Sequence, residues 1–456
     1  MTVVKETRTV HSNGDDVETK LQRIAEKARK DPKCKFTSLF HLVSTDLLRG
    51  CFEGLRKDAA SGIGGVTKEE YGNDLEANLA VLVEKLHRMS YIPQPVRRVY
   101  IPKPGGTRQR PLGIPALEEK LVQSALVRIL EAVYEGDFID DSYGFRPGRG
   151  CHDALRTLSH EVEGREVHYV VEVDIRGFFD NVQHDWMMKF LGHRVADKRV
   201  LRYVKRFLMA GVMEDGEIVA TEMGTPQGGI ISPLLSNIYL HYSLDLWFTR
   251  LFARGCKGRA RLIRYADDFV VCFQYEGDAK LFRNELDGRL AKFGLEVAAE
   301  KTKVLEFGPL AESRAKARGE KPQTFDFLGL THFCSRSQSG SIFRMKRVTA
   351  RKKFKAKLRE FKEWLKANRT RPLKELMKIV AAKLRGHFAY YGVSDNARKI
   401  GRFAAEGRTL LYRWLNRRSN RGSRSWEKSR GGRDSNVPTG QGSPGVHARA
   451  RAASGR

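Results

Sequence analysis

The pattern of apolar and polar positions along the chain predicts helices separated by a few short strands. Apolar residues recur at helical spacing from about Leu21 through Phe40 to Leu48, and again over residues 68–89, 121–134, 235–246, 278–293, 373–391 and 396–415. Residues 170–175 alternate instead and are rich in β-branched side chains, which predicts a strand. Ser232 and Pro233 predict a helix start, with the serine as N-cap and the proline at the first helical position.

Two segments have the pattern of β-hairpins. Residues 93–115 are basic and rich in proline and glycine, and they predict a hairpin with a tight turn at Gly105-Gly106. Residues 261–273 consist of two short apolar runs around the tetrapeptide Tyr265-Ala266-Asp267-Asp268. The second hairpin therefore carries two adjacent carboxylates at its tip.

Charge adds a partner to this picture. The chain has 456 residues, of which 83 are Lys or Arg and 54 are Asp or Glu, so its formal net charge is +29. An excess of this size is typical of proteins that bind nucleic acid, although some proteins are merely basic. The segment 341–370 contains twelve basic and two acidic residues, with aromatic residues interleaved, which favours contact with a duplex or a folded RNA.

Cysteine spacing and the absence of long apolar runs indicate the cellular compartment in which the protein works. The six cysteines lie far apart with no CxxC pair, which argues against a zinc module and against a disulfide framework. No apolar leader begins the chain, and no stretch approaches the length of a membrane span. We therefore expect a cytoplasmic protein that has no membrane partner.

The paired carboxylates are the strongest candidate for chemistry. Two adjacent carboxylates at the tip of an apolar hairpin are costly unless a cation neutralises them, and Mg²⁺ favours carboxylate and phosphate oxygens. Templated nucleotide addition needs two such metal ions, held by carboxylates on adjacent strands. Asp267 and Asp268 would supply two ligands, and Asp174, at the end of the predicted strand 170–175, would supply a third.

Aromatic residues follow the third carboxylate in Asp174-Ile-Arg-Gly-Phe-Phe-Asp-Asn181. A ring just past Asp174 can stack under the incoming sugar and exclude a 2′-hydroxyl, which would make the product DNA. Phe179 is the candidate for this gate, and its alternative role is packing in the core. Asp180 is more simply explained as a turn residue that caps the next helix than as a metal ligand.

These motifs together resemble a bacterial group II intron reverse transcriptase/maturase. The matching blocks, in the order of that family, are Ile101-Pro-Lys103, Arg110-Pro-Leu-Gly-Ile-Pro115, Ser142-Tyr-Gly-Phe-Arg-Pro-Gly-Arg149, Asp174-Ile-Arg-Gly-Phe-Phe-Asp-Asn181, Gly224-Thr-Pro-Gln-Gly-Gly-Ile-Ile-Ser-Pro-Leu-Leu-Ser-Asn-Ile-Tyr239, Tyr265-Ala-Asp-Asp268, Lys301-Thr302 and Phe327-Leu-Gly329. Leu384-Arg-Gly-His-Phe-Ala-Tyr-Tyr-Gly392 and Trp414-Leu-Asn-Arg-Arg-Ser419 resemble the maturase-specific domain. The resemblance runs from about Leu21 to Trp426.

The resemblance implies an α+β, right-hand polymerase fold and a role for individual residues. The fold would comprise a disordered N-terminus (1–20), an N-terminal extension with fingers (21–165), a palm with a small antiparallel sheet (166–335), a helical thumb and maturase-specific domain (336–418) and a disordered basic tail (419–456). The catalytic metal ligands would be Asp174, Asp267, Asp268 and the backbone carbonyl of Ile175. The deoxynucleoside triphosphate would be bound by Lys103, Arg110, Phe179, Gln227 and Gly228. The template or primer would be contacted by Arg146, Arg149 and Lys301.

The implied activity is RNA-templated DNA synthesis with two Mg²⁺ ions in the site. The implied partners are group II intron RNA, an RNA template with a DNA or RNA primer, deoxynucleotides and a DNA target site, and the protein would work in the nucleoid or in a ribonucleoprotein. It would also assist splicing by binding its intron, for retrohoming. The sequence leaves open a splicing-only maturase with an idle polymerase, and a domesticated reverse transcriptase in repair or defence.

The C-terminal segment departs from the family pattern. After Trp426 the family usually continues with an apolar, proline-containing segment, whereas this sequence continues with serine, glycine and arginine. No Cys/His endonuclease module is recognised. We therefore expect weakened engagement of a DNA target, no second-strand cleavage by this chain and retained polymerisation.

Overall fold

The computed structural model describes residues 16–102, 109–164, 166–214, 216–219, 222–225, 228–337 and 339–417. Its N-terminal part contains the helices α1 (Val17–Lys30), α2 (Thr45–Gly54), α3 (Lys68–Gly72), α4 (Leu75–His87), α5 (Leu117–Tyr134) and α6 (Cys151–Glu163), with the strands β1 (Val96–Pro102) and β2 (Gln109–Ile114) between α4 and α5. The middle part contains β3 (Tyr169–Asp174), α7 (His184–Leu191), α8 (Lys198–Leu208), β4 (Val212–Glu214), β5 (Glu217–Val219), α9 (Ser232–Leu240), α10 (Ala253–Gly255), β6 (Ala260–Tyr265), β7 (Asp268–Phe273), α11 (Glu276–Ala291) and β8 (Lys303–Glu306).

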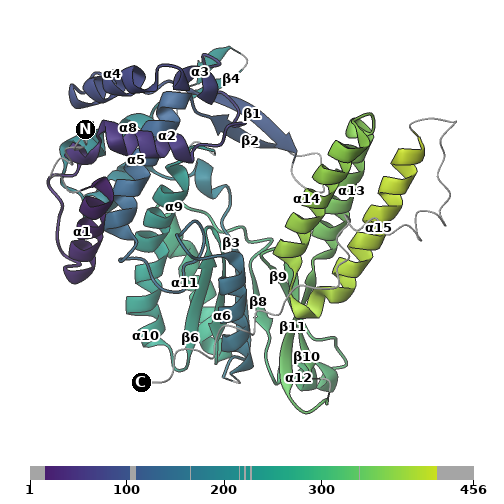
Figure 1. Cartoon of the computed structure of the whole chain (residues 1–456). Helices are drawn as coiled ribbons and strands as arrows, with labels where there is room; N and C mark the ends of the chain where they lie inside the picture. Colours follow the sequence, from purple (N-terminus) through teal and green to yellow (C-terminus); the bar gives the residue numbers. More distant parts are fainter. Residues whose placement is uncertain are drawn as a thin grey trace, which may run out of the picture.

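The remaining elements form a second, C-terminal group. They are α12 (Ala311–Ala317), β9 (Thr324–Phe327), β10 (Leu330–Arg336), β11 (Phe343–Thr349), α13 (Arg351–Asn368), α14 (Leu373–Tyr391) and α15 (Ala397–Asn416). In Figure 1 the helices α13, α14 and α15 stand together beside the strand-rich middle of the molecule. None of the helices within the described ranges is long and apolar enough to cross a membrane.

Three small sheets organise the strands. The central sheet has the order β6-β7-β3-β8, and every neighbouring pair in it is antiparallel. The N-terminal sheet has the order β2-β1-β4-β5, and β1 pairs with β2 as an antiparallel hairpin. The C-terminal sheet has the order β11-β10-β9 and is also antiparallel. The structure thus confirms the mixed α and β content and the small antiparallel sheet expected from the sequence.

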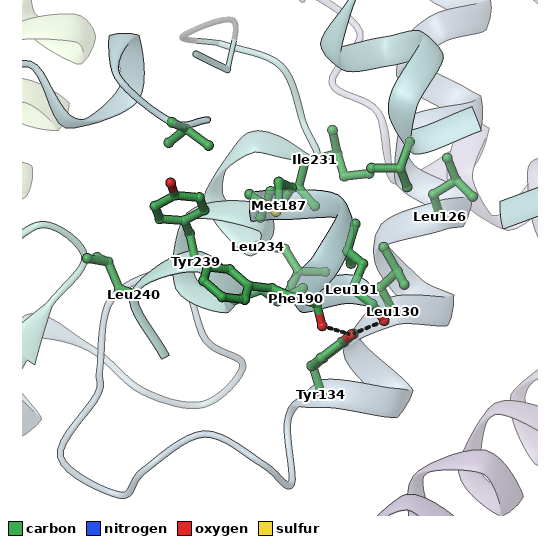
Figure 2. Close-up of a cluster of buried hydrophobic side chains, with 14 of the residues drawn as sticks. Leu126, Leu130, Tyr134, Met187, Phe190, Leu191, Ile231, Leu234, Tyr239 and Leu240 are labelled. Atoms are coloured by element: carbon green, nitrogen blue, oxygen red, sulfur yellow. Dashed lines mark hydrogen bonds between the residues drawn. The ribbon is translucent and has the colours of Figure 1, made fainter. Parts of the chain in front are cut away.

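Both faces of the central sheet are buried. Successive side chains of a strand point to opposite faces, so neighbouring residues of one strand belong to different cores. Val171 and Val173 of β3 belong to a large core with the N-terminal helices, whereas Val170 belongs to a second core with α6 and the C-terminal sheet. Figure 2 shows part of the first core, in which the labelled side chains are Leu126, Leu130, Tyr134, Met187, Phe190, Leu191, Ile231, Leu234, Tyr239 and Leu240. There the Tyr134 hydroxyl donates to the Leu191 carbonyl at 2.9 Å, so this buried hydroxyl is satisfied.

The C-terminal helices have their own core. It contains Phe354, Phe361, Leu365, Leu376, Val380, Leu384, Phe403, Leu411 and Trp414. Asn396 connects these helices to the C-terminal sheet: it is fully buried, its side-chain oxygen accepts from Thr349 N at 2.8 Å, and its amide donates to the Tyr391 carbonyl at 3.0 Å. Tyr391 is buried, whereas Tyr390 is 40% exposed.

Local details correct three of the sequence predictions. The helix predicted over 68–89 is interrupted after Asn73, because Asp74 leaves the helical region (φ −122°, ψ 43°). Ser232 is the first residue of α9 and not its N-cap, which is Ile231. The region 336–418, predicted to be helical, first contains the strand β11 and becomes helical only at Arg351. There Met345 is buried, while Arg344 forms an ion pair with Glu163.

Both predicted hairpins are present. β6 and β7 form an antiparallel pair on either side of the acidic turn, and β1 pairs with β2. The turn predicted at Gly105-Gly106 lies outside the described residues, as do the predicted disordered tail 419–456 and residues 1–15 of the predicted disordered N-terminus. The last residues of that predicted N-terminus are helical, because α1 already begins at Val17.

Candidate active site

The register of the central sheet brings the three predicted catalytic carboxylates together. Asp174, the last residue of β3, pairs directly with Asp268, the first residue of β7. Asp267 lies next to it in the two-residue connection between β6 and β7. Carboxylates that are far apart in the sequence therefore converge at one end of two adjacent strands, as the sequence predicted.

The turn that carries Asp267 has an unusual backbone. Ala266 has φ 57°, in the left-handed region that non-glycine residues rarely adopt. Gly144 lies against it, and a Cβ built on Gly144 would approach Ala266 N to 2.3 Å. Residue 144 must therefore be glycine for the turn to lie where it does.

The three carboxylates lie close together, and both burial and mutual repulsion disfavour the ionisation of Asp267 and Asp268. Burial raises the pKa of the Asp268 carboxyl to about 7, and the charges of Asp267, Asp174 and Glu172 contribute to this rise. Burial also raises the pKa of Asp267, an effect that the guanidinium groups of Arg110 and Arg264 oppose. A group of carboxylates that resists ionisation in this way is stabilised by a cation.

One cation already lies against the cluster, because the Lys301 ammonium forms an ion pair with the Asp174 carboxylate. The donor set, which consists of carboxylate oxygens, has the chemistry that hard divalent ions prefer. Among the described residues, no group of three or more His, Cys, Asp or Glu side chains is arranged as a metal site in its present rotamers. A divalent ion at Asp174 would compete with Lys301 for this carboxylate.

The backbone around Ile175 is held by a bridge to the segment before β8. An isolated bridge joins Ile175 to Val297, and its two hydrogen bonds run from Arg176 N to the Glu296 carbonyl and from Ala298 N to the Asp174 carbonyl. The Ile175 carbonyl takes part in neither bond. The fit of this oxygen as a metal ligand remains a prediction.

Of the predicted nucleotide-binding residues, the described ones are Arg110, Phe179 and Gly228. Arg110 is an exposed residue at the start of β2, and its charge acts on Asp267. Phe178 is buried, whereas Phe179 is only partly buried, so Phe179 is the ring of the pair that can reach a ligand. Lys103 and Gln227 lie outside the described residues.

Gly228 supports the site in a way that the sequence did not reveal. Its φ is 108°, and a Cβ added to it would approach the Gly113 carbonyl to 2.4 Å and the Leu112 side chain to 3.0 Å. The close approach that requires glycine is therefore made to β2, which carries Arg110. Gly228 thus joins the loop before α9 to the N-terminal sheet.

The structure separates the two arginines that were expected to contact template or primer. The Arg146 side chain is only 3% exposed; it forms an ion pair with Glu135 at 2.8 Å and donates to the carbonyls of Ile139 and Ser142, each at 2.7 Å. This guanidinium holds a loop together, and its geometry does not support the predicted contact. Arg149 is 29% exposed and bonds to Asp140, so its role in binding remains a prediction.

A cavity of about 630 Å³ lies between Asp268 and the C-terminal helices. Its lining combines cations, aromatic rings and one of the three carboxylates; among the lining residues are Asp268, Lys353, Lys357, Lys383, His387 and Tyr390. Leu328 connects its two sides: Leu328 N lies 3.5 Å from the Asp268 carboxylate, and the Leu328 carbonyl accepts from the Tyr390 hydroxyl at 3.1 Å. The cavity places basic helices directly beside the acidic turn.

Comparison with known proteins assigns the chain to a protein family. Residues 101–332 match the family model of the reverse transcriptase (RNA-dependent DNA polymerase), and residues 351–432 match the group II intron maturase-specific domain. The chain belongs to the group II intron family of reverse transcriptases with a maturase domain. Reverse transcriptases as a family use divalent metal ions.

Individual relatives agree with this assignment. The group II intron-encoded protein LtrA of Lactococcus lactis subsp. cremoris is 38% identical over 51% of this chain and 38% of its own length. Protein YkfC of Escherichia coli is 34% identical over 62% of this chain and 83% of its own length. Nuclear intron maturase 2 of Arabidopsis thaliana is 33% identical over 22% of this chain and 14% of its own length. The chain thus spans well under half of LtrA.

Proposed function

We propose that this chain is the RNA-directed DNA polymerase of a group II intron, which copies intron RNA into DNA and assists splicing by binding that RNA. The observation that carries the proposal is the direct pairing of Asp174 with Asp268 across two strands, with Asp267 on the adjoining turn. This arrangement suits the in-line attack of a primer 3′-hydroxyl on a deoxynucleoside triphosphate. The family assignment gives the arrangement its reaction.

Asp174, Asp267, Asp268 and the Ile175 carbonyl would hold two Mg²⁺ ions. When bound, the ions would supply activation of the primer hydroxyl and neutralisation of the departing pyrophosphate. Arg110 and Lys103 would hold the triphosphate, because a guanidinium fork and an ammonium are suited to phosphate oxygens. Phe179 would exclude a 2′-hydroxyl, and Gln227 with Gly228 would border the nucleotide.

The C-terminal helices would bind RNA and the template–primer duplex. Lys353, Lys357 and Lys383 line the cavity beside Asp268, and their charges are suited to backbone phosphates. The intron RNA, an RNA template with its primer and a DNA target would be the partners for retrohoming, in a ribonucleoprotein inside the bacterial cell. Binding of the intron by these helices would be the basis of the maturase role.

Primer extension on an RNA template tests the polymerase. We expect the purified chain to extend a DNA primer with deoxynucleotides and Mg²⁺, and Asp267→Ala to abolish extension. Asp180→Ala is the matched control, because Asp180 is an exposed carboxylate only six positions after Asp174 in the sequence. It should extend the primer like the parent chain.

Binding of intron RNA, measured with the same variants, separates the two activities. Asp267→Ala should bind RNA within a few-fold of the parent, because one charge is small beside a net charge of +29. If the parent binds RNA but extends no primer, the splicing-only alternative replaces our proposal. If ribonucleotides alone support full synthesis, the product assignment is wrong.

A further inference from the structure

Arg264, two residues before the acidic turn, is completely buried and fully paired. Its guanidinium forms an ion pair with Asp245, in which Nε donates to Oδ1 at 2.9 Å and Nη2 donates to Oδ2 at 2.6 Å. The third nitrogen, Nη1, donates to the Asn237 side-chain oxygen and to the Ala266 carbonyl, both at 3.0 Å. The arginine therefore reaches from the core to the backbone of the turn.

The two side-chain partners of Arg264 come from a single irregular helix. Asn237 lies in α9, and Asp245 lies in the π-helical turn His241–Asp245 that follows it. Both side chains are fully buried. A π-helical turn changes the direction of the side chains that follow it, and such turns are common at functional sites. Here the irregular turn carries the carboxylate that holds the arginine.

Asn237 connects the arginine to the other side of the turn. Its amide nitrogen donates to the Gly144 carbonyl at 2.7 Å, and Gly144 packs directly against Ala266 N. The next residue back, Tyr143, donates its backbone N–H to the Arg264 carbonyl at 2.9 Å. The left-handed Ala266 thus lies between Arg264 and Gly144, and the Asn237 side chain forms hydrogen bonds with both.

The cost of this network indicates a purpose beyond stability. A buried ion pair is often no more stabilising than well-packed apolar side chains of the same volume, so stability alone does not explain it. A residue in the left-handed region persists only where its surroundings impose that conformation. The Ala266 carbonyl accepts a hydrogen bond from the buried guanidinium, and the next residue is Asp267.

We propose that Arg264, held by Asp245 and Asn237, is a positioning residue that fixes the Ala266–Asp267 peptide and with it the direction of the Asp267 carboxylate. The inference rests on the proposed polymerase function for its catalytic consequence. Arg264 itself touches neither substrate nor metal; it acts through the Ala266 carbonyl. Its contribution is to hold the turn in the conformation that the chemistry requires before a nucleotide arrives.

Arg264→Lys tests the proposal, because lysine keeps the charge but cannot donate in three directions at once. Arg194→Lys is the matched control. Arg194 is also buried, pairs with Asp137 at 3.2 Å and donates to the carbonyls of Ala28 and Asp31, away from the acidic turn. Both variants are compared below their melting temperatures, by primer extension and by amide hydrogen exchange.

We expect Arg264→Lys to lower kcat by about tenfold or more while KM for the deoxynucleotide changes by less than about threefold. Amide exchange over residues 264–268 should become faster. Arg194→Lys should leave both kcat and the amide exchange of residues 264–268 at the values of the parent chain. Equal kcat and equal exchange of the turn in the two variants would overturn the proposal.

Two outcomes are kept separate by design. If the parent chain extends no primer, the proposed function fails, and the exchange of the turn alone decides whether Arg264 holds it. If Arg264→Lys does not fold, Asn237→Asp replaces it. That change preserves size and an acceptor for Arg264, and it replaces the amide that donates to the Gly144 carbonyl by a carboxylate oxygen, which cannot donate when ionised. It should lower kcat and speed exchange in the same way; parent-like values would contradict the proposal.

Discussion

Asp174 and Asp268 occupy directly opposed positions in the central sheet, so their meeting depends on the register of two strands. A shift of one residue would turn either side chain to the opposite face. The apolar residues of β3 and β7 prevent such a shift, because both faces of these strands are buried. At the scale of single residues, the site is therefore secured by packing on both sides of the carboxylates.

Phe179 gives a test at this scale. We expect Phe179→Val to raise the incorporation of ribonucleotides relative to deoxynucleotides by about tenfold or more, because the smaller side chain leaves room for a 2′-hydroxyl. The measurement is the ratio of kcat/KM for the two nucleotides. Phe178→Leu is the control: Phe178 is buried, so this change should lower stability and leave the ratio unchanged.

At the scale of elements, local sequence patterns correctly predicted the strand and the hairpin that carry the three carboxylates. The hairpin around Asp267 and Asp268 and the strand ending at Asp174 were both recognisable in this way. The roles of Arg264 and Gly228 were not, because their partners lie far away in the sequence or are backbone atoms. Arg146 was misjudged for the same reason: a basic residue in a motif gives no sign that Glu135 and two carbonyls will enclose it.

The contact between Gly228 and β2 gives a second test. Gly228→Ala should raise KM for the deoxynucleotide and lower stability, because its Cβ would collide with the Gly113 carbonyl and displace the strand that carries Arg110. Gly216→Ala is the matched control. Gly216 also has a positive φ, 89°, but a Cβ there meets nothing within 4 Å. If both variants change KM equally, backbone strain and not the contact is responsible.

The start of α5 predicts a pH dependence. Glu119 is 1% exposed, and burial raises the pKa of its carboxyl from 4.5 to about 7. Between these two values the folded chain holds more protons than the unfolded chain, so the contribution of Glu119 to stability falls as pH rises. Glu119→Gln removes this ionisation.

We therefore expect the free energy of unfolding of Glu119→Gln, relative to the parent, to increase from pH 4.5 to pH 7. Denaturant titrations at several pH values measure it. Glu118→Gln, a change in the adjacent and less buried carboxylate, serves as the control. If the difference in free energy of unfolding between Glu119→Gln and the parent stays constant across this range, burial does not raise the pKa of the Glu119 carboxyl.

At the scale of the whole molecule, the excess of positive charge is distributed so that the acidic turn faces basic helices. Composition alone predicted a nucleic-acid partner, but it did not predict that Lys353 and Lys383 would line the same cavity as Asp268. That juxtaposition depends on how the C-terminal helices pack, which no local pattern encodes.

Salt dependence tests this arrangement. Replacing both Lys353 and Lys383 by Gln should reduce the slope of log K against log salt for RNA binding by roughly 1.5, because each phosphate that a lysine neutralises adds about 0.7–0.9 to that slope. The control replaces Lys189 and Lys280, which are also exposed but lie on α7 and α11. It removes the same charge and should leave the slope nearly unchanged. An equal effect would mean that net charge, and not the cavity, governs binding.

The backbone of Leu328 connects the central sheet to the C-terminal helices. Its N–H faces the Asp268 carboxylate and its carbonyl accepts from Tyr390 of α14, so one residue lies between this carboxylate and the C-terminal helices. A duplex that pushes α14 aside must either break the Tyr390 bond or drag Leu328 with it. In the second case the carboxylate loses a hydrogen bond and its charge becomes harder to maintain. Strain from a poorly seated duplex would then reach the acidic end of the central sheet through a single residue.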